Sequence, residues 1–297
     1  MASDGGVVSD RLSEALAGRL ALQMSVSSLP MVEEWMDAPL SRWLDSVPLP
    51  LEMPGGEGPP LIVAVGSDAQ LLRWRAGGSA AGVVPKMVEY LRRAGALPAD
   101  FSKVDGIGQA LEPAVVGSWI EARPGVVATG WFVADRMDLN QLRGLLGEGD
   151  WMNGLSAAGG PCLEVGRSIG DGAMTGMLVQ LAGDAAGKVA AAAEVFAGYG
   201  FAFDGGPAAR FGDRELAIGV RARQGAVVSV RLVVERPGPG AAVEACTGVG
   251  LELAPAVTQV ERSIGAGELI QLEIERSAAG PSVVVEYMAG ASRAPAN

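Results

Sequence analysis

The feature that most constrains the fold is a pair of strand-like segments followed by a helix-compatible stretch, which recurs five times from about residue 61 to the C-terminus. A repeat of this size is typical of a fold built by repetition. Because one hairpin leaves a sheet face uncovered, we expect an α+β domain in which ten antiparallel strands form a closed barrel with helices outside. The paired segments are Leu61–Val65 with Leu71–Ala76, Val115–Arg123 with Val126–Ala134, Cys162–Ile169 with Thr175–Ala182, Leu216–Arg223 with Ala226–Glu235, and Leu269–Arg276 with Ser282–Met288.

The segments between the strand pairs supply the outer helices. Apolar spacing and end signals predict helices at Val84–Ala94, Leu139–Leu146, Ala185–Tyr199 and Ala254–Ile264. Residues 1–60 are expected to form two helices and a linker rich in proline and glycine, which pack on a barrel spanning residues 61–290. A division into two α+β domains near Gly159 is the alternative organisation.

The chain contains no histidine and carries a formal net charge of −11. Hydrolases that use Ser-His-Asp or Cys-His groups, and metal sites with histidine ligands, are therefore excluded. A pentein-like propeller is another fivefold fold, but its enzymes use a Cys and His pair that this chain cannot supply. Because the chain is acidic and lacks a basic run, we expect neither a nucleic acid nor an anionic membrane as partner.

The sequence also predicts the cellular location of the protein and the redox state of its two cysteines. No apolar segment is long enough to span a bilayer, and the first ten residues lack the layout of a signal peptide, which predicts a cytoplasmic location. Cys162 and Cys246 lie in different repeats without metal-ligand spacing, so we expect both to be reduced and no metal to be held by the protein itself.

Strand alternation predicts which residues line the barrel. In Leu269–Arg276, Gln271, Glu273 and Glu275 alternate with apolar residues and therefore share one face. The apolar face should meet the helices, which leaves a wide, polar lumen. The other residues assigned to that lumen are Arg73, Arg75, Trp119, Glu121, Arg123, Trp131, Glu164, Gln180, Arg221, Arg223, Arg231 and Glu286.

This set of side chains suits a particular kind of ligand. Guanidinium groups can hold an anionic head, and indole rings can face a cationic or apolar part. The alternative interpretation is that the charges are solvated and only pair across neighbouring strands for modest stability.

The fivefold architecture resembles the ABBA aromatic prenyltransferases, whose fold is called the PT barrel. Two segments carry local likeness: Asp100-Phe-Ser-Lys-Val104, which is similar to the cyanobactin peptide prenyltransferases, and Tyr199-Gly-Phe-Ala-Phe-Asp-Gly205. The resemblance implies a bacterial enzyme of secondary metabolism that transfers an isoprenoid from an allylic diphosphate to an aromatic or peptide side-chain acceptor.

Site roles follow from the same resemblance. It implies that Trp119 and Trp131 shield the allylic cation, that Glu121 or Glu273 accepts the proton of the acceptor, and that Mg²⁺ accompanies the diphosphate. The implied diphosphate ligands are Arg73, Arg75, Arg221, Arg223 and Arg231.

The chain also departs from the family pattern. PT barrels carry several tyrosines in the lumen, whereas this chain has only Tyr90, Tyr199 and Tyr287, of which the first two fall on expected helices. The alternative function is therefore a noncatalytic barrel of the same topology that binds a small molecule or a peptide.

Overall fold

A computed structural model describes residues 62–66, 72–77, 79–93, 97–123, 126–133, 139–146, 150–169, 172–203, 205–253 and 269–288. The helices predicted within residues 1–60 and the helix predicted at Ala254–Ile264 lie outside these residues. The described part runs from the first predicted hairpin to the last.

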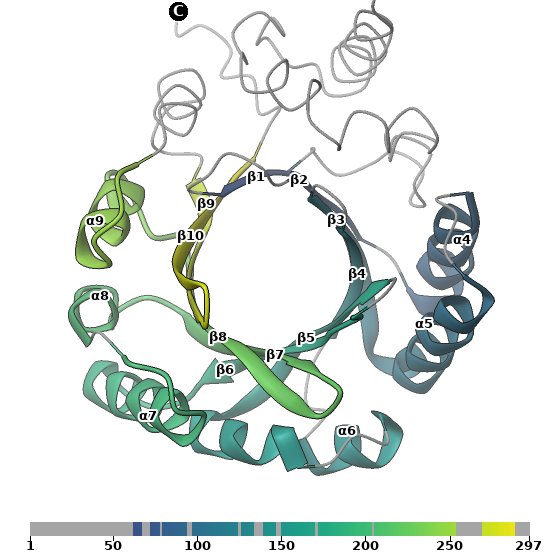
Figure 1. Ribbon diagram of the computed structural model, residues 1–297, viewed down its shortest axis with the longest axis horizontal. Helices are drawn as coiled ribbons and strands as arrows, with labels where there is room; N and C mark the ends of the chain where they lie inside the picture. The colour runs from purple at the N-terminus through teal and green to yellow at the C-terminus, as the bar shows by residue number, and fades with distance from the viewer. Residues whose placement is uncertain are drawn as a thin grey trace, which may run out of the picture.

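The described strands form one antiparallel sheet that curls into a ring (Figure 1). Hydrogen bonding follows the order β1-β10-β9-β8-β7-β6-β5-β4-β3-β2, and β1 and β2 at its two ends lie side by side. The strands are β1 Ile62–Gly66, β2 Leu72–Gly77, β3 Val115–Arg123, β4 Val126–Val133, β5 Gly159–Ile169, β6 Thr175–Leu181, β7 Leu216–Arg223, β8 Ala226–Glu235, β9 Leu269–Ser277 and β10 Gly280–Met288.

Helices cover the outside of the ring (Figure 1). They are α4 Ala80–Arg93, α5 Pro98–Leu111, η3 Glu112–Ala114, α6 Leu139–Leu146, η4 Asp150–Ala158, α7 Ala185–Gly198, α8 Gly205–Arg210 and α9 Ala241–Gly248. Local sequence sets their ends. In α7, for example, the Asp184 side chain accepts a hydrogen bond of 2.8 Å from the Gly187 N–H, and Gly200 follows the helix with a φ of 76°.

The main hydrophobic core lies between the helices and the outer face of the sheet. Leu216, Ile218 and Val220 of β7 belong to it, together with Phe196 of α7. Leu272 and Ile274 of β9 also pack there, whereas Glu273 between them turns to the lumen. The alternation predicted for Leu269–Arg276 is confirmed, and the apolar residues of β7 follow the same pattern.

Among the helices of the described ranges, none combines the length and the apolar character that a membrane crossing requires.

Candidate active site

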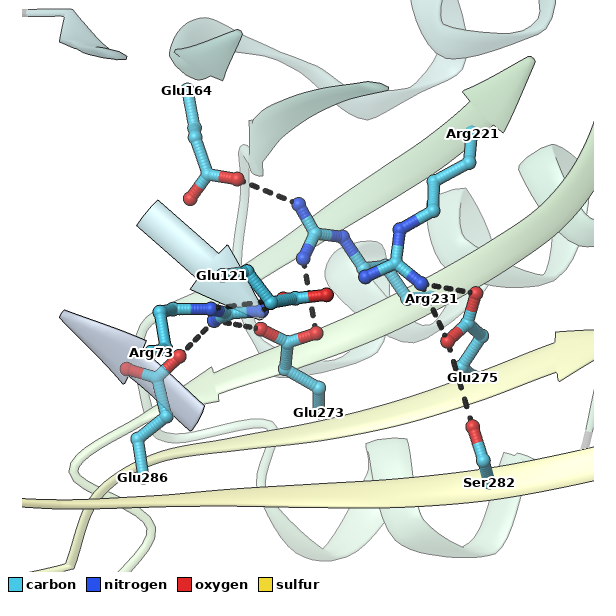
Figure 2. Close-up of polar contacts among 9 residues, drawn as sticks. All are labelled: Arg73, Glu121, Glu164, Arg221, Arg231, Glu273, Glu275, Ser282 and Glu286. Atoms are coloured by element: carbon cyan, nitrogen blue, oxygen red, sulfur yellow. Dashed lines mark hydrogen bonds and ion pairs between the residues drawn. The ribbon is translucent and has the colours of Figure 1, made fainter. Parts of the chain in front are cut away.

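Arg73 of β2 stands at the centre of a buried ion-pair network in the lumen (Figure 2). Its Nε and Nη2 donate to Glu121 Oε2 at 3.1 and 2.6 Å, and its Nη1 donates to Glu273 Oε1 at 2.6 Å. Nη1 also donates to Glu286. Three carboxylates from three strands therefore surround one guanidinium, which is only 2% exposed.

Arg231 of β8 extends this network. Its Nη2 donates to Glu164 Oε1 at 2.8 Å and its Nη1 to Glu273 Oε2 at 3.0 Å, so Glu273 bridges two arginines (Figure 2). Burial by itself raises the pKa of Glu273, but Arg231, Arg73 and Arg221 outweigh it and lower that pKa to about 2. Glu273 is therefore held ionised at neutral pH.

Arg221 of β7 forms a separate pair nearer to solvent. Its Nη1 donates to both carboxylate oxygens of Glu275 at 2.8 and 2.9 Å, and the Ser282 hydroxyl donates to Glu275 at 3.5 Å. The Arg221 side chain is 16% exposed, compared with 5% for Arg231. Arg221 is the more accessible of these two guanidinium groups.

A cavity of about 150 Å³ opens beside this network. Trp119 of β3 lines it, with Glu121 and Glu164 as carboxylates and Arg167, Arg221 and Arg231 as cations. An engineered apolar cavity of about this volume holds benzene, so the space fits one ring or a short branched chain.

A small apolar cluster also lies on the lumen side of the sheet, formed by Leu178, Ala217 and Val233, with Leu163 packed against it.

The side chain of Trp119 forms one wall of the cavity. It is 7% exposed, and the guanidinium carbon of Arg73 lies 5.6 Å from the centroid of its ring. An indole at this position can face a cationic group, as the contact with Arg73 demonstrates. The prediction that Trp119 lies in the lumen is confirmed.

The predicted lumen position of Trp131 is wrong. Trp119 is paired with Gly130 and Trp131 with Ser118, so the two tryptophans project to opposite faces of the sheet. Trp131 is fully buried in the outer core, next to Gly108 of α5. It cannot shield a cation in the lumen.

The remaining predicted arginines have different positions. Arg75 is paired with Trp119 in the β2–β3 ladder. Arg223 is exposed at the end of β7, beside Gly172 of the β5–β6 connection. The diphosphate role of Arg73, Arg75, Arg221, Arg223 and Arg231 stays a prediction. Of these, Arg221 and Arg231 line the cavity.

Among the proposed carboxylates, Glu121 lines the cavity, but Glu273 does not. Sequence reasoning placed Glu164 in the lumen without a role, although it lines the cavity directly. The sequence indicates the lumen position of Glu164, because Glu164 alternates with Val165, whose side chain belongs to the outer core. Within the described ranges, no group of three or more Cys, Asp or Glu side chains is arranged to hold a metal ion.

Comparison with solved structures gives matches over nearly the whole chain. The chain is similar to 5-dimethylallyltryptophan synthase from Streptomyces coelicolor, at 14% identity and a TM-score of 0.61, over 97% of this chain and 98% of that one. It is also similar to the apo form of the prenyltransferase PriB (14% identity, TM-score 0.62, 97% and 96% covered). A 6-dimethylallyl tryptophan synthase matches at 14% identity and a TM-score of 0.63, over 93% and 95%.

Sequence comparison adds little. No family model matches the chain. A PH domain-containing protein of Dictyostelium discoideum is 29% identical over 91 residues, which is 30% of this chain, and the match covers 20% of that protein. The structural matches are what identify the architecture: the chain has the PT-barrel fold of the ABBA-type aromatic prenyltransferases.

Proposed function

We propose that this protein is a prenyltransferase that moves an isoprenoid from an allylic diphosphate to an aromatic or peptide side-chain acceptor in the barrel lumen. The observation that carries the proposal is the convergence of an indole, three arginines and two carboxylates on one cavity inside a PT barrel. Two structures of similar fold agree with it. They are 5-dimethylallyl tryptophan synthase with DMASPP and Trp, and PriB with L-tryptophan and dimethylallyl thiolodiphosphate.

The cationic side of the cavity would hold the diphosphate. Arg221 and Arg231 line the space, and preorganised guanidinium groups stabilise the negative charge that grows on a departing diphosphate. As the carbon–oxygen bond of the donor breaks, the allylic cation forms in reach of Trp119, whose ring favours positive charge.

The carboxylate side would receive the proton. When the acceptor forms its new bond to the allylic carbon, an aromatic carbon or a heteroatom must lose a proton, and a nearby carboxylate can take it. Glu164 and Glu121 line the cavity, whereas Glu273 is fully buried between Arg73 and Arg231. We assign the proton to Glu164, because it accepts one hydrogen bond, from Arg231, whereas the Glu121 Oε2 accepts two from Arg73.

A second candidate function is noncatalytic binding of a small molecule or peptide in the same cavity. The observation in its favour is that Arg73, Arg221 and Arg231 all donate to glutamates. An incoming diphosphate must compete with these carboxylates. Mg²⁺ bound to the diphosphate would reduce the repulsion between the donor and these carboxylates by offsetting the charge of the donor, which is why we propose it as an accompanying ion.

Calorimetric titration with dimethylallyl thiolodiphosphate, an unreactive donor, tests the choice with and without Mg²⁺. We expect binding by the wild-type protein and at least tenfold weaker binding by Arg221→Gln, since a lost hydrogen bond to a charged group is worth about 1.5–3 kcal/mol. Arg210→Gln is the matched control, because Arg210 pairs with Glu244 on the outer helices. Binding of this analogue without turnover of dimethylallyl diphosphate on indoles, phenols and peptides would favour the noncatalytic function, and no binding would reject the donor site.

A further inference from the structure

Three glycines stand side by side on the lumen wall. The strand registers pair Gly130 of β4 with Gly166 of β5, and Gly166 with Gly176 of β6. Trp119 is paired with Gly130 at one end of this row, and Arg221 with Gly176 at the other. Residues paired in this way share a face of the sheet, so we call Gly130, Gly166 and Gly176 the glycine row.

The indole of Trp119 lies on the first two members of the row. A Cβ at Gly130 would lie 2.5 Å from Cε2 and Cζ2 of Trp119, and a Cβ at Gly166 would lie 2.5 Å from its Cζ2. Any side chain at either position would displace the ring. Glycine is therefore required at both positions for the indole to rest against the wall.

The third member of the row is open. A Cβ at Gly176 would lie 3.6 Å or more from its nearest neighbours, which is ordinary van der Waals contact, and Gly176 lines the cavity together with Trp119. One end of the row is thus filled by an indole, and the other borders empty space.

From this arrangement we infer that Trp119 on the glycine row limits the transferred group to one isoprene unit. The inference rests on the proposed function and names its donor class as a five-carbon allylic diphosphate. A cavity of about 150 Å³ fits a group of five or six carbons. A ten-carbon chain needs additional space along the row, which the indole occupies.

The test compares dissociation constants for dimethylallyl and geranyl thiolodiphosphate by calorimetry. We expect the wild-type protein to prefer the five-carbon analogue by about tenfold or more, and Trp119→Leu to shift the ratio of the two constants by about tenfold toward the geranyl analogue. Trp119→Phe is the matched control, since it keeps an aromatic ring on the row and should keep the preference of the wild type.

A second variant tests the size limit and leaves Trp119 in place. Gly176→Ala adds one methyl group to the cavity without a clash, so it should weaken binding of both analogues severalfold while the melting temperature stays close to that of the wild type. Thermal unfolding of each variant shows that the barrel is intact.

The outcomes separate the two claims. If the dimethylallyl analogue binds but Trp119→Leu leaves the ratio unchanged, the size limit is wrong and the proposed function stands. The size limit is also overturned if Gly176→Ala binds both analogues as the wild type does. If neither analogue binds to the wild-type protein, the proposed function fails and the inference fails with it.

Discussion

The guanidinium of Arg73 on β2 forms a buried ion pair with the carboxylate of Glu286 on β10, 213 residues later in the chain. β2 and β1 are the two ends of the hydrogen-bonded strand order, and β10 is the neighbour of β1. The pair therefore bridges the seam of the barrel. Since Arg73 also binds Glu121 on β3 and Glu273 on β9, one side chain ties four strands together.

Substituting Arg73→Gln should destabilise the fold strongly. The change leaves three buried carboxylates without their central cation, and breaking a buried pair in this way removes about 3–5 kcal/mol of unfolding free energy. Urea unfolding measures the loss. Arg210→Gln, at an ion pair whose arginine is 61% exposed, is the control and should change the unfolding free energy by less than about 1 kcal/mol. Equal effects of the two substitutions would show that Arg73 does not hold the seam.

Acid should weaken the same network. The pKa of Glu273 is about 2 in the folded protein against an ordinary value of 4.5. A carboxyl group with a lowered pKa contributes stability that is complete above its unfolded pKa and is lost as the pH falls from about 4.5 toward 2. We expect the unfolding free energy to fall in this window by up to about 1.4 kcal/mol per pH unit from this group. Glu273→Gln, measured in parallel, should show a shallower acid dependence.

Strand positions could be predicted because polarity alternates along them. In β9, for example, Glu273 and Ile274 differ in polarity and face opposite sides, as expected. The face of Trp131 could also be predicted from the sequence. Only Pro124 and Gly125 separate Arg123 from Val126, which favours a pair between these two residues. That pair places Trp119 opposite Gly130, so Trp131 must project to the other face. The polarity pattern of β4 alone does not show which face Trp131 occupies, whereas its pairing with β3 does.

Other parts could not be predicted from local sequence. α5 was missed because Gly106 and Gly108 disfavour a helix. In the fold, a Cβ at Gly108 would lie 2.9 Å from Val84, so this glycine allows α4 and α5 to pack closely. The role of Arg73 was equally hidden, since its partners are 48 to 213 residues away and only barrel closure brings them together.

Cys162 should be unreactive in the folded protein. Burial raises the pKa of its thiol to about 12, and the thiol donates a hydrogen bond of 3.5 Å to the Glu164 carbonyl. Because the thiolate is the reactive form, a disulfide reagent at neutral pH should label Cys162 only after unfolding. The measurement is clearest in a Cys246→Ser variant, which leaves Cys162 as the sole thiol. Rapid labelling under native conditions would contradict the buried position.

Glu164→Gln should separate binding from chemistry. The amide retains the shape of the side chain and a hydrogen bond acceptor for Arg231, so the affinity for dimethylallyl thiolodiphosphate should change little. It cannot accept a proton, and loss of a general base lowers turnover by about a hundredfold or more. Steady-state rates with dimethylallyl diphosphate and an active acceptor give the turnover, and calorimetry gives the affinity. Glu121→Gln is the comparison, because Glu121 lines the same cavity. If only Glu121→Gln loses turnover, the proton acceptor is Glu121, and Glu164 serves to hold Arg231.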